Sequence, residues 1–212
     1  MVRARGSAHC FNYIADTAEV SINLEKLSQE ISINKDEQIV RVPAGMKYGE
    51  LANLLDSRGW AIHNMASLPH ISVAGAVATA THGSGVENGN LATAVKSLEI
   101  VLPDGSMKRI NKGDSNFEGY VVGLGLTGIV LNLDLAIEPT FNISQTVYRG
   151  LSRESYITNL KEIMSLAYSV SYFTTWAAAG GGEVWAKFKS GSSAPDGLFE
   201  AYPATSNRHP LP

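Results

Sequence analysis

Two segments rich in small residues have the chemistry to bind an anion. The first is residues 6–12, which read GSAHCFN, and the second is the longer run of residues 67–85. Small side chains leave backbone N–H groups uncovered, and successive N–H groups can surround a pyrophosphate. Four hydroxyl groups would add hydrogen-bond donors without bulk: those of Ser7, Ser72, Thr79 and Thr81. Together the segments predict a phosphate-bearing ligand, whereas either one alone could equally be a tight turn packed under a neighbouring strand.

A third glycine-rich segment, residues 123–128, matches the G-x-G-x-x-G spacing of dinucleotide-binding loops. That fingerprint requires a strand before the glycines and a helix that opens on them. Residues 129–137 instead alternate between apolar and polar side chains, which is typical of a strand. The sequence therefore argues against a nicotinamide-binding Rossmann site and an NAD-dependent dehydrogenase.

The histidines and the single cysteine give no sign of a metal site. His63, His70 and His82 lack the spacing of shared ligands, and neither cysteine nor an acidic cluster joins them. Cys10 cannot form an internal disulfide, which fits a reducing compartment. Residues 1–6 lead into Gly-Ser and not into the apolar stretch of a signal peptide. We therefore expect no metal and a cytoplasmic location.

The composition is that of a globular protein with little charge. Of its 212 residues, 44% are hydrophobic and 17% are charged, and the net charge is −3. Because the chain has no basic excess, we do not expect nucleic acid as a partner. No apolar run approaches the roughly 18 residues needed to cross a bilayer, so we expect no membrane partner.

The elements that must position these segments are mostly strands. Period-two alternation predicts strands at residues 20–24, 39–42 and 129–137, and a hairpin over residues 98–110 with its turn at 103–105. Leucines at i, i+3 and i+4 predict a helix over residues 48–57 that ends near Gly59.

The pattern of residue types changes from about residue 149. We expect a helix over residues 156–168, a loop over 176–182 and a strand over 184–188. Mixed strands with a few short helices favour an α+β fold over a regular βαβ alternation.

The first two glycine-rich segments resemble the FAD-binding loops of the vanillyl-alcohol-oxidase family, and within it those of the alditol and xylitol oxidases. Residues 6–11 are similar to the family's G-x-G-H-S-F loop. Residues 64–75, NMASLPHISVAG, together with residues 81–85, THGSG, are similar to its pyrophosphate loop. Further matches resemble the start of the family's substrate domain: residues 167–171, Trp176, residues 184–185 and His209-Pro210.

The resemblance implies a fold and a domain organisation. We expect an α+β protein in which residues 1–140 form a PCMH-type FAD-binding domain of two α/β subdomains. Residues 141–212 would begin an α+β substrate domain, or cap domain. Because the chain opens directly on its first loop and stops within this second domain, we expect sequence to be missing at both ends, and we expect the isolated chain to be inactive.

The resemblance also implies the site residues. His9 would be bonded covalently to the 8α-methyl group of the flavin, and Ser67 would lie at the flavin ring on the substrate side. The residues implied to contact FAD are Gly6, Ser7, Ala8, His9, Cys10, Ser67, Ser72, Gly75, Thr79, Ala80, Thr81, His82 and Ile129. Ala8 and Ala80 replace glycines of the family and Cys10 replaces a serine. A glycine-to-alanine change matters only where φ is positive or where the Cβ meets the cofactor.

The implied activity is the oxidation of a sugar alcohol such as xylitol or sorbitol. A hydride would pass to flavin N5, and dioxygen would be reduced to hydrogen peroxide. The amino acids at positions 65–70 favour a polyol substrate. The first alternative is an aldonolactone, the substrate of gulonolactone and D-arabinono-1,4-lactone oxidases. The second alternative is a non-catalytic, truncated FAD-binding fragment. No catalytic base is assigned, and we expect the full-length form to be a monomer.

Overall fold

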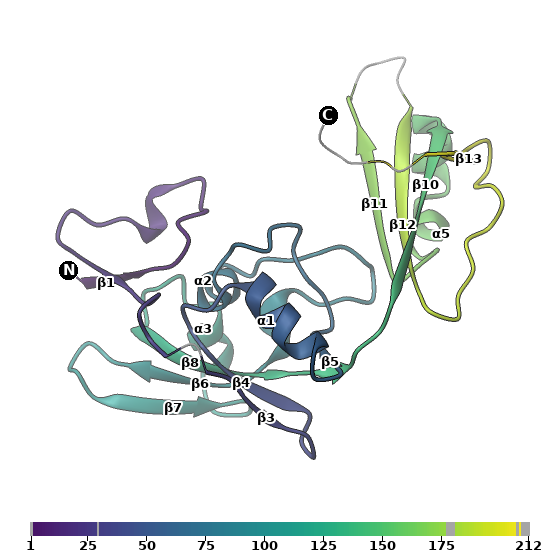
Figure 1. The fold of residues 1–212 in the computed structure, drawn as a ribbon. Helices are drawn as coiled ribbons and strands as arrows, with labels where there is room; N and C mark the ends of the chain where they lie inside the picture. Colours follow the sequence, from purple (N-terminus) through teal and green to yellow (C-terminus); the bar gives the residue numbers. More distant parts are fainter. Residues whose placement is uncertain (1, 29, 177–180, 207, 209–212) are drawn as a thin grey trace. The chain divides into compact units, whose positions relative to one another are not determined.

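The computed structural model describes residues 2–28, 30–176, 181–206 and 208, and it divides into two compact units (Figure 1). Unit 1 comprises Met1–Gly83 and Gly89–Thr140. Unit 2 comprises Ser84–Asn88 and Phe141–Pro212. Each unit has a hydrophobic core of its own.

The centre of unit 1 is a five-stranded antiparallel sheet with the strand order β3-β4-β8-β6-β7. Its strands are β3 (Ser32–Asn34), β4 (Ile39–Pro43), β6 (Val95–Val101), β7 (Met107–Asn111) and β8 (Ile129–Ala136). The alternating patterns at residues 39–42 and 129–137 are confirmed as β4 and β8, and the predicted hairpin is confirmed as β6 and β7. Alternate residues of the strands are fully buried, among them Val40, Val42, Leu133 and Leu135.

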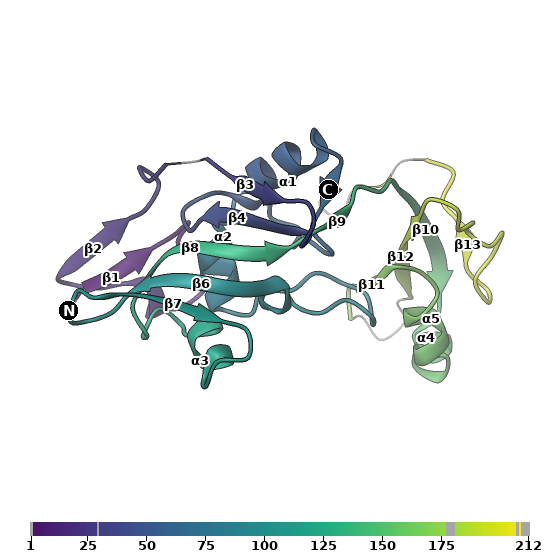
Figure 2. The ribbon, with the colours of Figure 1, turned by 90° about the horizontal axis from the view of Figure 1, so that it is seen from below.

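Three helices lie on the same side of this sheet (Figures 1 and 2). They are α1 (Tyr48–Asp56), α2 (Val73–Ala78) and α3 (Phe117–Val121). The leucine spacing correctly predicts α1, because Leu51 and Leu55 are fully buried in the core. The N–H of Gly59 donates to Asp56 O at 2.9 Å and its φ is +80°, as expected of a residue just past a helix end.

Shorter elements complete unit 1. Strand β1 (Val2–Arg5) pairs in parallel with β2 (Val20–Asn23), and the 3-10 turn η1 (Tyr13–Ala15) lies between them. The predicted strand at residues 20–24 is thus confirmed and ends one residue early. A second pair joins β5 (Trp60–Ala61) to β9 (Glu138–Pro139), and the 3-10 turn η2 (Leu91–Ala94) precedes β6.

The face of the five-stranded sheet that points away from the core carries a ladder of charged side chains. Arg41 on β4 donates to Glu99 on β6 at 2.5 Å and to Asp134 on β8 at 3.4 Å. Asp134 is buried, and it also accepts from Ser97 at 2.7 Å and from Arg109 on β7. The ladder therefore ties four neighbouring strands together across one face.

Unit 2 is built on a four-stranded antiparallel sheet with the order β11-β12-β10-β13. Its strands are β10 (Ile143–Leu151), β11 (Ser169–Thr174), β12 (Gly182–Lys189) and β13 (Tyr202–Pro203). The predicted strand at residues 184–188 is confirmed within β12. Residues 177–180 of the predicted loop lie outside the described residues, as do His209 and Pro210.

The single helix predicted over residues 156–168 is wrong. The structure has two short helices instead, α4 (Arg153–Thr158) and α5 (Leu160–Met164), and Figure 1 shows α5 against one face of the sheet. The first begins earlier because the Ser152 hydroxyl caps it, accepting from Ser155 N at 3.1 Å. The break falls at Asn159, whose side-chain amide donates to Ser155 O at 3.0 Å and so competes with the helical backbone.

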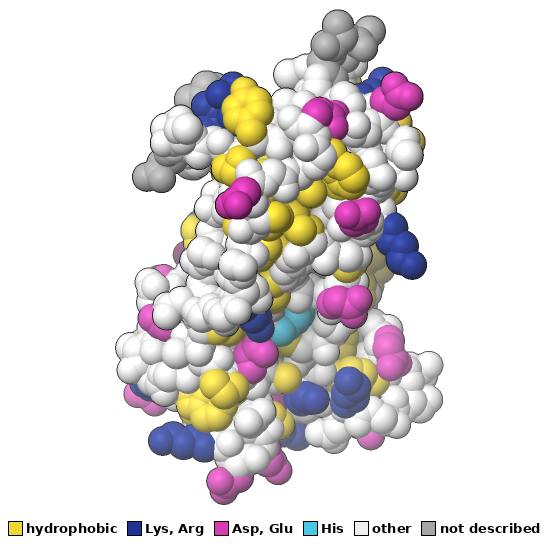
Figure 3. Space-filling model, turned by 90° about the vertical axis from the view of Figure 1, so that its right-hand side faces the viewer, with side chains coloured by type: hydrophobic (Ala, Val, Ile, Leu, Met, Phe, Trp, Pro, Cys, Tyr) yellow, Lys and Arg dark blue, Asp and Glu magenta, His cyan; other side chains and the backbone are white. Residues whose placement is uncertain are grey.

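The surface mixes charge and apolar area. On the face in Figure 3, acidic and basic side chains are interspersed with hydrophobic ones, in keeping with 17 basic and 20 acidic residues in the sequence. Across the described part of the chain, none of the helices has both the length and the apolar character to cross a membrane.

Candidate functional site

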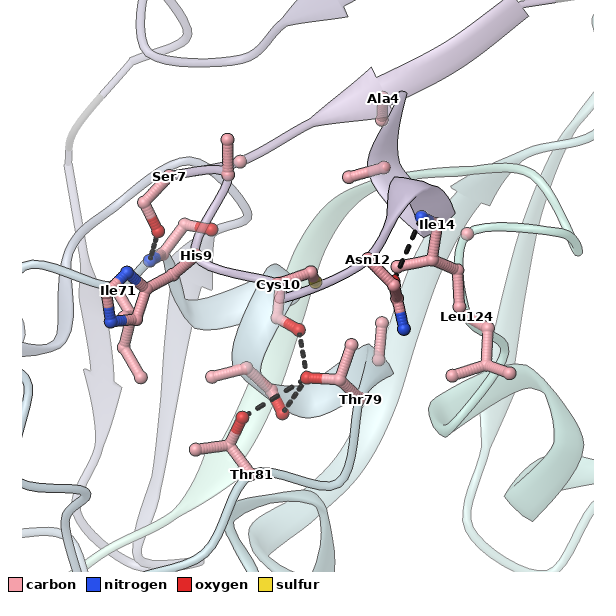
Figure 4. Close-up of a pocket in the computed structure, with 18 of the residues that line it drawn as sticks. Ala4, Ser7, His9, Cys10, Asn12, Ile14, Ile71, Thr79, Thr81 and Leu124 are labelled. Carbon is pink, nitrogen blue, oxygen red and sulfur yellow. Dashed lines mark hydrogen bonds between the residues drawn. The ribbon is translucent and has the colours of Figure 1, made fainter. Parts of the chain in front are cut away.

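A pocket of about 480 Å³ lies in unit 1 (Figure 4). It is lined by the loop that follows β1 and by residues of α2 and its flanks. The structure thereby brings together most of the predicted site residues: Gly6, Ser7, Ala8, His9, Cys10, Ser72, Gly75, Thr79 and Thr81 all line it. The two glycine-rich segments, more than 50 residues apart in the sequence, form one site.

The first loop is held by contacts on both of its sides. Before it, β1 is paired with β2. After it, the Asn12 side chain accepts from Ile14 N at 3.1 Å and caps η1, while the Arg3 guanidinium donates to Ile14 O at 2.6 Å. Asn12, the last residue of the first segment, also lines the pocket, as do Arg3 and Ile14, which the sequence did not indicate. An asparagine just before a turn is a common capping signal and could have indicated Asn12.

A direct hydrogen bond joins the two segments. The backbone N–H of Ser72 donates to the Ser7 hydroxyl at 3.0 Å, and Figure 4 shows Ser7 near Ile71. A Cβ built on Gly6 would lie 2.2 Å from Ser72 Oγ, and one built on Gly75 would lie 2.7 Å from it. A larger residue at Gly6 would therefore press against the second segment, whereas one at Gly75 would crowd Ser72 within its own segment.

The second segment presents hydroxyl groups to the pocket more than bare backbone. Its middle folds as α2, and the N–H groups of Val73 and Ala74 donate to Met46 O at 2.8 Å and Ala44 O at 3.1 Å. The expectation of uncovered backbone N–H groups is therefore wrong for these residues, because tertiary partners occupy them.

Two threonine side chains stand at the C-terminal end of α2. The Thr79 hydroxyl donates to Gly75 O at 3.0 Å, and Thr79 Oγ1 lies 3.2 Å from Thr81 Oγ1 (Figure 4). Because the Thr79 proton is committed to the Gly75 carbonyl, the Thr81 hydroxyl is the donor in the Thr79–Thr81 hydrogen bond, and it would have to leave that bond to donate to a bound anion.

Aromatic side chains surround the position of His9. The His9 ring meets the His70 ring edge-on at 5.1 Å between centroids and the Phe11 ring at 6.2 Å. All three side chains are exposed, and Phe11 is completely so. A planar ligand bound near His9 could therefore contact aromatic rings.

Both alanines that stand where the resembling family has glycine adopt a left-handed backbone. The φ of Ala8 is +50° and that of Ala80 is +51°. Left-handed backbone strains a residue that carries a Cβ. The substitutions are therefore costly to the fold at both positions, and Ala8 in addition faces the pocket.

Four of the predicted residues do not line the pocket. Ser67 is exposed in an irregular segment, although its neighbour Leu68 does line the pocket. Ala80 follows α2, and His82 is exposed with Nδ1 2.8 Å from Gly83 O. Ile129 is the first residue of β8 and pairs with Val101.

The segment rejected as a Rossmann fingerprint also reaches the site. Leu124 and Gly125 line the pocket, and the Leu124 N–H donates to Ala78 O at 3.2 Å. No helix opens on these glycines, because β8 follows directly. The rejection therefore holds, yet the spacing of glycines was itself a signal of a ligand loop.

No group of three or more His, Cys, Asp or Glu side chains able to hold a metal ion occurs among the described residues.

The chain belongs to the FAD binding domain family, whose model matches residues 1–111. In sequence it is similar to an alditol oxidase from Streptomyces sp., with 42% identity over 211 residues, covering 99% of this chain and 50% of the relative. An L-gulonolactone oxidase from Mus musculus is 28% identical over 165 residues, covering 77% of this chain and 36% of the relative.

A solved structure shares the fold. A cholesterol oxidase mutant from Brevibacterium sterolicum superposes with a TM-score of 0.79 at 14% identity, covering 92% of this chain and 41% of that one. The expected α+β fold of the PCMH-type FAD-binding class is thus confirmed. The chain spans about half the length of the alditol oxidase it matches, and less of the other relatives.

Proposed function

We propose that this chain holds FAD in the pocket of unit 1 and is part of an oxidase of sugar alcohols such as xylitol or sorbitol. The observation that carries the proposal is that residues resembling both FAD-binding loops line a single pocket in a chain 42% identical to an alditol oxidase. The oxidase activity, the substrate and dioxygen as the acceptor are all part of the proposal, as are a monomeric state and a cytoplasmic location.

The residues present fit a flavin dinucleotide. A volume of about 480 Å³ lies within the range of small-molecule sites. Gly6 and Gly75 leave a surface without side chains where the two segments meet. Hydroxyl groups in the middle of the pocket suit a pyrophosphate, and ring side chains around His9 suit the flavin.

The proposed roles follow from these positions. His9 would carry the flavin ring through a covalent bond to the 8α-methyl group. Ser7, Thr79 and Thr81 would hydrogen-bond phosphate or ribityl oxygens, and Gly6, Ala8, Cys10, Ser72 and Gly75 would contact the cofactor through backbone or small side chains. Contacts from Ala80, His82 and Ile129, and a substrate contact from Ser67, stay predictions.

When bound, FAD would supply the redox chemistry, namely acceptance of a hydride from the carbon that bears the substrate hydroxyl and transfer of the electrons to dioxygen to give hydrogen peroxide. The residues of this chain bind and orient. The turn capped by Asn12 anchors the end of the loop that carries His9, and the Thr79–Thr81 hydrogen bond holds the two hydroxyl groups side by side at the end of α2. We assign no catalytic base.

An aldonolactone oxidase is the second candidate. It is supported by the similarity to L-gulonolactone oxidase and, at 30% identity over 145 residues, to a putative D-arabinono-1,4-lactone oxidase from Neurospora crassa. Peroxide release decides between the candidates, measured on a protein that contains these residues with xylitol, sorbitol and aldonolactones in parallel. Turnover of lactones alone would overturn the polyol assignment.

The covalent bond is tested by acid precipitation of the flavin-loaded protein. We expect the pellet of the parent to retain yellow, fluorescent flavin and that of His9→Ala to release it. His70→Ala is the matched control, because it removes the neighbouring exposed ring and should leave the flavin attached. Flavin that washes completely from the parent would rule out the covalent bond. Non-covalent FAD binding would still be measured, from the absorption spectrum before precipitation.

A further inference from the structure

The dipeptide Asn88-Gly89 is the most reactive asparagine position of the chain. Of all the asparagines in the sequence, only Asn88 is followed by glycine. Because glycine has no Cβ, its backbone nitrogen can approach the side-chain Cγ of the preceding asparagine without steric hindrance. Attack of that nitrogen on Cγ expels ammonia and closes a succinimide ring, so this position is prone to deamidation.

The packing around Gly89 requires a glycine. Asn88 and Gly89 lie outside helices and strands, and the Asn88 N–H donates to Gly85 O at 3.1 Å to close a turn. A Cβ built on Gly89 would collide with the Thr93 side chain. A larger residue, which would slow the reaction, is therefore opposed by the fold.

The Asn88 side chain is held through the same nitrogen that the reaction expels. Its amide group donates to Ser84 O at 3.0 Å and to Tyr168 O at 2.9 Å. The Ser84 hydroxyl also lies 2.5 Å from that of Ser169, a buried residue at the start of β11. Because both N–H groups of the amide are engaged, the reaction requires local opening of residues 84–88, which costs less free energy than global unfolding.

The product of deamidation does not fit this closed arrangement. An aspartate or isoaspartate carboxylate only accepts hydrogen bonds, and Ser84 O and Tyr168 O are themselves acceptors. Two hydrogen bonds are thus replaced by repulsion between oxygen atoms, and isoaspartate in addition lengthens the backbone by one carbon. A segment that has reacted while open therefore cannot close again.

We propose that Asn88-Gly89 is a deamidation site that the closed segment of residues 84–88 protects, and that its reaction releases this segment from the start of β11 for good. The bond from Asn88 Cγ to its amide nitrogen breaks as a bond from Cγ to Gly89 N forms, and ammonia leaves with the Gly89 proton. One water molecule then opens the succinimide to aspartate or isoaspartate. The reaction needs neither FAD nor substrate, so it is independent of the proposed function.

The first test follows deamidation by peptide mapping and mass spectrometry while the purified chain is incubated at mildly alkaline pH. We expect the product at Asn88 to form about tenfold faster in urea than in buffer, because unfolding removes the protection. Ser169→Ala removes one hydrogen bond that fastens the segment and should speed the reaction of the folded chain about threefold. Ser171→Ala is the matched control, because it removes a hydroxyl two residues further along β11, and it should react as the parent does.

The second test measures the consequence of the reaction for unit 2. In hydrogen exchange, Asn88→Asp should show faster exchange than the parent in β11 and β12. Asn142→Asp adds the same charge at an exposed position of unit 2 and should exchange as the parent does. Parent protein that has deamidated during storage gives the same measurement on a chain that was folded before it reacted, so the comparison does not depend on whether the variant folds.

Several results would overturn the proposal. One is a folded chain that forms no product at Asn88 in the time in which the chain in urea reacts completely. Another is an equal rate in buffer and in urea, or in Ser169→Ala and the parent, because either removes the protection by the closed segment. Unchanged hydrogen exchange in β11 and β12 of the deamidated protein would show that the segment stays closed after the reaction.

Discussion

At the scale of single residues, three of the seven described non-glycine residues with positive φ lie in or beside the pocket of unit 1. Ala8 and Leu124 both have positive φ and both line it, and Ala80 lies between the pocket-lining residues Thr79 and Thr81. Each costs free energy that a glycine would not, because a Cβ in the left-handed region crowds the following carbonyl. The fold therefore tolerates strain in the loops that line this pocket, whereas the core strands follow their local preferences.

We predict that Ala80→Gly stabilises the chain. Relief of the left-handed strain gains about 1–2 kcal/mol, and the extra freedom of glycine in the unfolded chain costs about 0.5–1 kcal/mol. The net gain in unfolding free energy should be about 0.5–1 kcal/mol, measured by urea titration, and Ala8→Gly should behave alike. The control is Ala52→Gly in the middle of α1, which should lose about 1 kcal/mol. A loss at Ala80 as large as that at Ala52 would contradict the positive φ.

At the scale of elements, side chains distant in sequence decide where strands and helices are held. The ladder of Arg41, Glu99, Asp134 and Arg109 crosses four strands of unit 1. In unit 2, the Glu200 carboxylate accepts from the Ser152 N–H at 2.8 Å and so adds a tertiary cap to the start of α4. Both features are electrostatic and both respond to a change of charge.

We predict that Asp134→Ala lowers the unfolding free energy by about 2–3 kcal/mol. The variant leaves Arg41, Arg109 and Ser97 without their shared acceptor. The loss of unfolding free energy is smaller than for a fully buried ion pair, because both guanidinium groups reach solvent. The measurement is chemical denaturation of unit 1. Asp36→Ala, an exposed acid in the turn between β3 and β4, should change stability by less than about 0.5 kcal/mol. Equal effects of the two variants would show that the ladder contributes nothing beyond surface charge.

We predict a pH-dependent contribution from Glu200. Hydrogen bonds from the Ser152 side chain and backbone lower the pKa of Glu200 from 4.5 to about 2. Because the folded pKa lies below the unfolded one, the stabilisation is fully present above pH 4.5 and is lost as the pH falls from 4.5 toward 2. The parent should therefore exceed Glu200→Gln in unfolding free energy at pH 7 by more than at pH 3. A difference that does not change with pH would contradict the low pKa.

At the scale of the whole molecule, the chain forms two cores joined by more than one crossing of the backbone. Residues Ser84–Asn88 belong to unit 2 although the sequence on both sides belongs to unit 1. The Asn88 side chain donates to Ser84 O at 3.0 Å and to Tyr168 O at 2.9 Å, and the Ser84 hydroxyl lies 2.5 Å from that of Ser169. This short segment is thereby fastened to the start of β11.

We predict that Asn88→Ala destabilises unit 2 selectively. Two hydrogen bonds are lost, each worth about 0.5–1.5 kcal/mol. Hydrogen exchange followed by mass spectrometry should show faster exchange in β11 and β12 and unchanged exchange in β6 and β8. Glu87→Ala, at an exposed position of the same segment, should leave both units as in the parent. Equal acceleration in the two units would contradict the assignment of the segment to unit 2.

The sequence by itself determined the strands with clear alternation, the helix α1 and the membership of an FAD-binding family. These depend on local periodicity and on runs of small residues, which can be read without knowing what packs against them. Residues 39–42 and 129–137 are examples, because their alternating apolar and polar side chains already indicate which positions are buried.

Only the tertiary structure decided how the site is assembled. It placed Leu124 and Ile14 in the pocket, engaged the N–H groups of α2 with Met46 and Ala44, and left Ser67 outside the lining. It also gave Ala8 and Ala80 their positive φ. The physical reason is the same in each case: a backbone dihedral or hydrogen-bond partner imposed by residues far away in the sequence outweighs local preference, and no pattern of neighbours along the chain records it.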